Sequence, residues 1–60
     1  MMNFREATKV AVTSMDFNTN VIYKDVTAVE STNELFTLYM KGGETATFHS
    51  ADWMWLAVGA

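Results

Sequence analysis

The side chains of His49, Ser50 and Asp52 are the residue types of a hydrolytic triad, gathered within four positions. A working triad needs its hydroxyl, imidazole and carboxylate to form one hydrogen-bonded chain. If the residues before position 50 form a strand, His49 and Ser50 point to opposite faces, and that chain cannot form. Ser50 and Asp52 are also common turn residues. We therefore expect a turn here and no catalytic residue.

The other motifs with chemical potential lead to the same expectation. The chain has no cysteine and one histidine, which excludes disulfides and leaves too few ligands for a zinc site. Gly42-Gly43 lacks the lysine and the following helix of a phosphate-binding loop. Glu30, Glu34 and Glu44 lie beside predicted turns, where solvated carboxylates are ordinary. The sequence thus predicts neither an enzyme nor a bound metal or cofactor.

The length of 60 residues predicts a single small domain, residues 1–60. A chain this short buries only about 60% of the surface that its unfolded form exposes. Its core rarely supplies more than roughly 3–5 kcal/mol of stability. Because disulfides and metals are excluded, association with another chain is the remaining source of support to consider.

Charge and hydropathy narrow the partners and the cellular compartment that the sequence predicts. Seven acidic and four scattered basic residues give a formal net charge of -3, which opposes binding to nucleic acid. No apolar run approaches the 18 residues of a membrane span, and Arg5, Glu6 and Lys9 stand where a signal peptide would be apolar. The absence of cysteine fits a reducing compartment. We expect a soluble, cytoplasmic protein that does not associate with membranes.

The clearest structural signal is a hairpin between Leu35 and Phe48. Apolar and polar residues alternate on both sides of Gly42-Gly43, which is typical of two strands joined by a tight turn. Both glycines are expected to adopt a positive φ in that turn. Upstream, 21–31 is rich in β-branched residues, and its imperfect alternation predicts a bulge or strong bend. The segments 16–20 and 32–34 supply further turn residues.

The two ends of the chain each allow two interpretations. Asn3 followed by Glu6 resembles a helix capping box, whereas Val10 and Val12 favour a strand. We expect a helical turn or loose segment near residues 3–8 and a strand near 9–17. At the other end, residues 50–52 either cap a short helix or form one tight turn before a strand. A helix without a polar face is poorly stable at this length, so the strand is favoured.

These elements predict an all-β or β-dominated domain of five strands. The expected architecture is a small twisted antiparallel meander that closes toward an SH3-like barrel, with a short helical turn at the N-terminus. The spacing of Tyr23-Lys24-Asp25-Val26, Leu38-Tyr39, Gly42-Gly43-Glu44, Phe48 and Asp52 resembles the very small β-meander or SH3-like proteins among uncharacterised phage and mobile-element reading frames of bacteria. The resemblance covers about residues 20–56. It implies an accessory protein that acts by binding, with no catalytic motif to transfer.

The final strand carries the main functional signal, because it is apolar on both faces. Met54, Leu56 and Val58 are expected to face the interior, which leaves Trp53, Trp55 and Ala57 on the outside. Two exposed tryptophans would form an adhesive patch of the kind that protein interfaces use. With Tyr39, these three residues make up the predicted interaction surface.

We therefore predict a non-enzymatic protein-interaction module that self-associates as a dimer through its C-terminal strand. A host protein is the other partner considered for this surface. One alternative is a small barrel that stacks single-stranded nucleic acid on Tyr39, Phe48 and the tryptophans, with Lys24 and Lys41 at the backbone. A further alternative is an acidic inhibitor that uses Glu30, Glu34 and Glu44 against a basic host enzyme.

Overall fold

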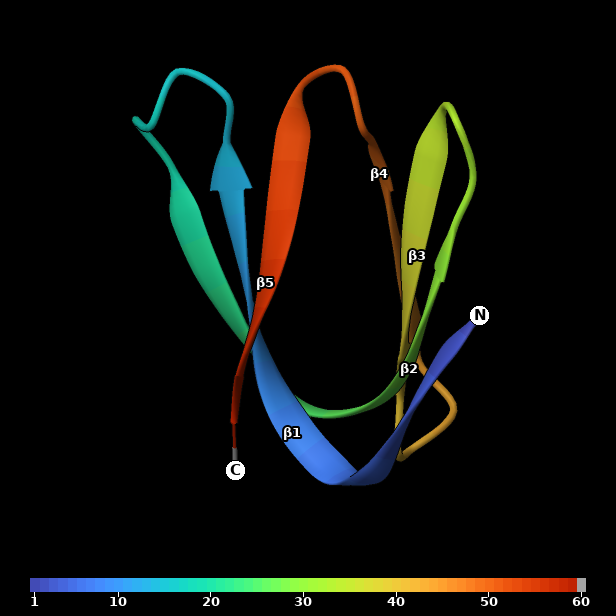
Figure 1. Cartoon of the computed structure of the whole chain (residues 1–60). Helices are drawn as coiled ribbons and strands as arrows, with labels where there is room; N and C mark the ends of the chain where they lie inside the picture. Colours follow the sequence, from blue (N-terminus) through green and yellow to red (C-terminus); the bar gives the residue numbers. More distant parts are fainter. Residues whose placement is uncertain (60) are drawn as a thin grey trace.

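The computed structural model describes residues 1–59, and these form one antiparallel sheet of five strands without a helix (Figure 1). The strands are β1 (Met2–Ser14), β2 (Asn20–Ser31), β3 (Leu35–Met40), β4 (Thr45–His49) and β5 (Trp53–Gly59). Their order across the sheet is β4-β3-β2-β1-β5, so the last strand returns to pair with the first. This confirms the predicted all-β class and the tight turn at residues 50–52 before the last strand.

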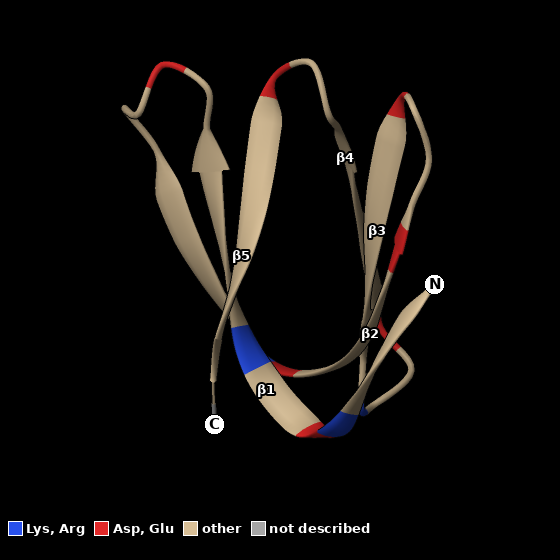
Figure 2. Ribbon diagram, viewed as in Figure 1, with Lys and Arg blue, Asp and Glu red and all other residues tan. Residues whose placement is uncertain are grey.

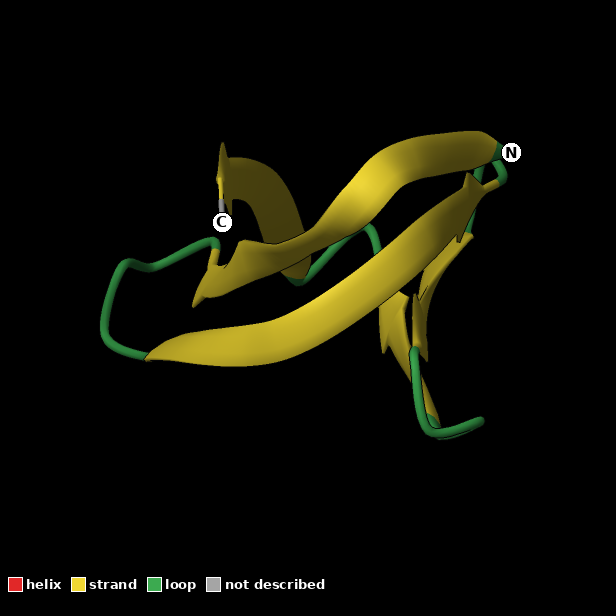
Figure 3. Cartoon of the chain, turned by 90° about the horizontal axis from the view of Figure 1, so that it is seen from below, coloured by secondary structure: helices red, strands yellow, loops and turns green. Residues whose placement is uncertain are grey.

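The sheet curls because its two long strands bend. β1 and β2 form the base of a U in Figure 1, and the long strands run side by side as curved ribbons in Figure 3. Their pairing register shifts between Asn3 and Thr8 and again before Val10, and Asp25 in β2 has a positive φ of 58°. Bulges of this kind increase strand bending and twist. The bend predicted within 21–31 is therefore present, and β1 bends with it.

The curl of the sheet brings aromatic side chains of non-neighbouring strands into contact. The rings of Tyr23 in β2 and Phe48 in β4 lie 5.9 Å apart although β3 separates the two strands in the sheet. Phe48 also approaches Trp53 of β5 at 5.6 Å, which brings side chains of the two edge strands together. Among the described strands β4 and β5 nevertheless share no ladder. The fold thus closes toward a barrel through side chains and stays open in its backbone.

The core lies inside this curl. Six side chains from β1, β2 and β3 are at most 1% exposed: Val10, Val12, Val26, Val29, Phe36 and Leu38. The ring of Phe36 stacks on that of Phe48, with centroids 5.3 Å apart. Burial of these branched and aromatic side chains is the main source of stability that a 60-residue sheet has.

The N-terminal segment differs from the prediction. The helical turn expected at residues 3–8 is wrong, because Met2 and Asn3 pair with Val29 and Ala28 of β2 and the whole segment belongs to β1. A capping box satisfies two backbone groups, whereas the extended segment pairs Met2 and Asn3 with β2 and also packs Phe4 against the core. The predicted strand at 9–17 also ends earlier, since Phe17 has a positive φ of 63° within a turn.

The hairpin between β3 and β4 is confirmed, with one difference in its turn. Of the two glycines only Gly43 has a positive φ, 92°. The N–H of Gly43 donates to the carbonyl of Met40 at 3.0 Å, and the N–H of Met40 donates to the carbonyl of Glu44 at 2.8 Å. These bonds describe a three-residue loop in which a turn is followed by a left-handed residue. Only that last position requires glycine.

We expect Gly43→Ala to lower the free energy of unfolding by about 1–2 kcal/mol, because a Cβ disfavours the left-handed conformation. Gly42→Ala is the matched control: its Cβ would meet only the carboxylate end of the Glu44 side chain, at 2.9 Å, which can move aside. Chemical denaturation of both variants measures the difference. Equal losses at the two positions would contradict this account of the turn.

A second turn fixes the end of the sheet where β1 stops. The Asp16 carboxylate accepts hydrogen bonds from the Ser14 hydroxyl at 2.6 Å and from the Asn18 N–H at 3.0 Å. The bond from Ser14, followed by that from Asn18, holds the pKa of Asp16 below its usual value. The N–H of Met15 donates to the carbonyl of Asp52 at 2.8 Å. The turn after β1 and the turn before β5 therefore lie side by side.

Candidate functional site

The residues of the apparent triad have structural partners. The Ser50 hydroxyl donates to the carbonyl of Asn33 at 3.2 Å, and its N–H donates to the carbonyl of Glu34 at 2.9 Å. The N–H of Asp52 donates to the carbonyl of His49 at 3.0 Å. Ser50 thus ties the turn before β5 to the turn before β3, the structural role expected from its residue type.

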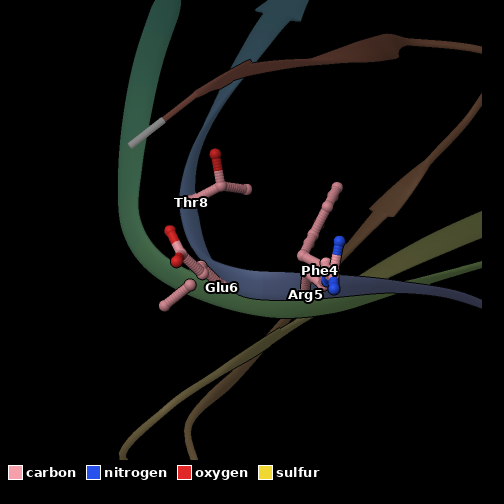
Figure 4. A pocket seen from close by; sticks show the side chains of 5 residues that line it. Phe4, Arg5, Glu6 and Thr8 are labelled. Atoms are coloured by element: carbon pink, nitrogen blue, oxygen red, sulfur yellow. The ribbon is translucent and has the colours of Figure 1, made fainter.

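Residues 1–59 contain no cluster of three His, Cys, Asp or Glu side chains placed to hold a metal ion. They also contain no helix that could cross a membrane. A shallow depression lies at the bend of β1, lined by residues 4–8. Figure 4 shows the side chains of Phe4, Arg5, Glu6 and Thr8 spread around this bend instead of converging on one point. The depression therefore lacks the converging polar groups of a small-molecule site.

The two tryptophans of the predicted surface face inward. Trp55 lies opposite Val12, which is fully buried, and Trp53 contacts Phe48. Both indoles are partly buried against the core. The outward orientation expected from the sequence is therefore wrong. β5 pairs with β1 in a register that gives the inner face to residues opposite Val10 and Val12. The indole of Trp53 also reaches Phe48 of β4 across the open side.

The other two residues of the predicted surface lie elsewhere. Ala57 is opposite Val10 and is exposed near the end of β5. Tyr39 lies on β3, which β2 and β1 separate from β5. Its hydroxyl donates to the Glu30 carboxylate at 2.9 Å, and this bond raises the pKa of Tyr39. The structure does not bring Trp53, Trp55, Tyr39 and Ala57 together into one continuous surface.

The exposed apolar side chains of β5 are instead those that the sequence assigned to the interior. Leu56 is 69% exposed, Val58 57% and Met54 40%. Ile22 of β2 is 49% exposed and belongs to the same row, because Leu56 and Ile22 both lie opposite Ala11 of β1. We call Ile22, Met54, Leu56 and Val58 the outer apolar patch. It extends across β5, β1 and β2 on the face turned away from the core.

The outer apolar patch borders a free strand edge. β5 pairs with β1 on one side, and its other side has no partner among the described strands. Edge strands are normally protected by charges, proline or a short length. β5 has seven residues and contains neither a charge nor a proline. β4, the other edge, has five residues, and its exposed side chains are Thr45, Thr47 and His49.

The stacking groups of the nucleic-acid alternative do not share a face. Phe48 and the tryptophans pack against the core, whereas Tyr39 lies on the other face of β3. Lys24 and Lys41 line one depression together with Asp25 and Glu44, whose charges oppose a phosphate. The structure therefore does not gather the rings and the lysines of this alternative on one face.

The acidic residues of the inhibitor alternative are also dispersed. Glu34 precedes β3 at one end of the hairpin, whereas Glu44 follows the turn at the other end. Figure 2 shows acidic positions at turns at both ends of the sheet. No single acidic face results.

Comparisons of the chain with known protein families, curated proteins and solved structures find no match.

Proposed function

We propose that the protein is a non-enzymatic interaction module of the cytoplasm that self-associates through β5. The observation that carries this proposal is the outer apolar patch, which lies on an unprotected edge strand. Monomeric proteins seldom leave large apolar side chains gathered around a free edge. The resemblance to small phage and mobile-element proteins that act by binding supports the same role.

β5 is the contact element, as the sequence predicts, but different side chains make the contact. Trp53 and Trp55 support β5 from the inside, and Leu56, Met54 and Val58 present the contact surface. Removing apolar surface from water contributes about 25 cal/mol per Å² and so favours the association. Association also adds to the stability of the folded state, which is small for a chain of this size.

We expect the wild-type molar mass to rise from that of one chain to that of two as protein concentration increases, measured by sedimentation equilibrium or light scattering. Leu56→Asp would bury an unpaired carboxylate in the contact and is expected to weaken association at least about tenfold. The control is Thr47→Asp, which places the same charge on the exposed side of the other edge strand and is expected to associate like the wild type.

Two results would contradict the proposal. One is a wild-type protein that stays monomeric up to near-millimolar concentration. The other is a Leu56→Asp variant that associates as tightly as the wild type while remaining folded by circular dichroism.

A further inference from the structure

We infer that two copies of the chain join edge to edge, with β5 of one antiparallel to β5 of the other and a two-fold axis beside Leu56, so that the two sheets become one. This inference rests on the proposed self-association and adds the geometry and the occupant of the surface. A two-fold axis perpendicular to the sheet keeps the outer faces on the same side. Met54, Leu56 and Val58 of both copies would then form one apolar row.

Charge decides between an antiparallel and a parallel arrangement. Asp52 directly precedes β5, and the hydrogen bond from Met15 to Asp52 places the Asp16 turn at the same end. At the other end of β5, Lys9 lies opposite Gly59. Figure 2 shows this polarity, with acidic positions at the turns above β5 and a basic position on β1 beside its lower end. Antiparallel pairing brings the acidic end of one copy to the Lys9 end of the other, whereas parallel pairing sets like charges together.

Side-chain size on the inner face also fits a second copy. With the axis at Leu56, residues whose numbers add to 112 lie opposite each other, so on the inner face Trp55 faces Ala57 across the new pair. The large indole of Trp55 then lies beside a small residue of the other copy. Because β5 contains no charge, two copies of the strand meet no like-charge repulsion along their length. A foreign strand would need the same lack of charge and a similarly small residue opposite Trp55.

Single cysteines test this geometry, because the natural chain has none. Leu56→Cys puts two thiols about 5 Å apart across the axis, and a displacement of the axis by one residue still leaves them about 7–8 Å apart. A short bis-maleimide is expected to link most of the Leu56→Cys dimers. Denaturing gel electrophoresis measures the linked fraction at a concentration where sedimentation shows the dimer.

Two control cysteines exclude the other arrangements. Ile22→Cys lies on the same outer face but two strands from the edge, so its thiols would be about 24 Å apart in the edge-to-edge dimer and close together if the outer faces stacked. Ala51→Cys lies just before β5, and its thiols would be more than about 25 Å apart in an antiparallel pair but adjacent in a parallel one. Both variants are expected to stay unlinked.

The outcomes separate the two proposals. A dimer that links through Ile22→Cys or Ala51→Cys, or that fails to link through Leu56→Cys, overturns the edge-to-edge geometry and leaves self-association standing. A wild-type chain that is monomeric at every concentration overturns both.

Discussion

Replacing Phe36 with alanine is expected to unfold a large fraction of the chains at room temperature. Phe36 is 1% exposed, and its ring stacks on that of Phe48. Removing a buried phenylalanine side chain costs about 3–5 kcal/mol. The net stability of a domain this small is itself roughly 3–5 kcal/mol. The loss is therefore about as large as the free energy of unfolding itself. Circular dichroism of a dilute sample, with a urea titration, measures it.

Phe36→Leu is the matched control, since it keeps an apolar side chain of similar volume and is expected to cost less than about 1.5 kcal/mol. The leucine variant should retain a cooperative unfolding transition. An alanine variant with the wild-type denaturation midpoint would show that the core is not centred on the inner face of β3.

Trp55→Ala and Leu56→Ala, adjacent substitutions on β5, are expected to have opposite effects on folding and association. Trp55 is partly buried against the core, so its loss should cost about 2–3 kcal/mol, somewhat less than a fully buried tryptophan. Leu56 is exposed in the monomer, so its loss should change monomer stability by no more than about 0.5 kcal/mol and weaken association instead. Denaturation of dilute samples and sedimentation of concentrated ones separate the two effects.

The opposite pattern, a stable Trp55→Ala monomer and an unstable Leu56→Ala monomer, would restore the orientation predicted from the sequence. The distinction also matters for any search for partners. A tryptophan variant that loses a partner has also lost part of its core, so it cannot identify the binding surface. Substitutions at Leu56 are the cleaner choice.

Local sequence signals located most of the strands and turns. The alternation around Gly42-Gly43 predicts the β3–β4 hairpin, and the broken alternation in 21–31 predicts a bend, which the structure places near Asp25. Such signals depend on neighbouring residues, which a sequence shows directly. The N-terminal segment was assigned incorrectly because its state depends on Met2 and Asn3 pairing with residues that lie 25 or more positions away.

The face of β5 could not be read from the sequence, because both of its faces are apolar. Hydropathy specifies the orientation of a strand only when one face is polar. What decides the orientation is the register with β1, where Val12 lies opposite Trp55 and Ala11 lies opposite Leu56. Ala11 and Ile22 continue the row of Leu56 on the outer face, but their place in that row follows from the register and not from the sequence.

The most direct test of the claim that β5 is the contact element is hydrogen exchange of the backbone amides at low-micromolar and near-millimolar protein concentrations. Exchange slows where a free edge gains hydrogen-bonding partners. We expect alternate amides within 53–59 to gain protection as concentration rises, while those on the free edge of β4 do not. Protection in β5 that is independent of concentration, or a gain confined to β4, would contradict it.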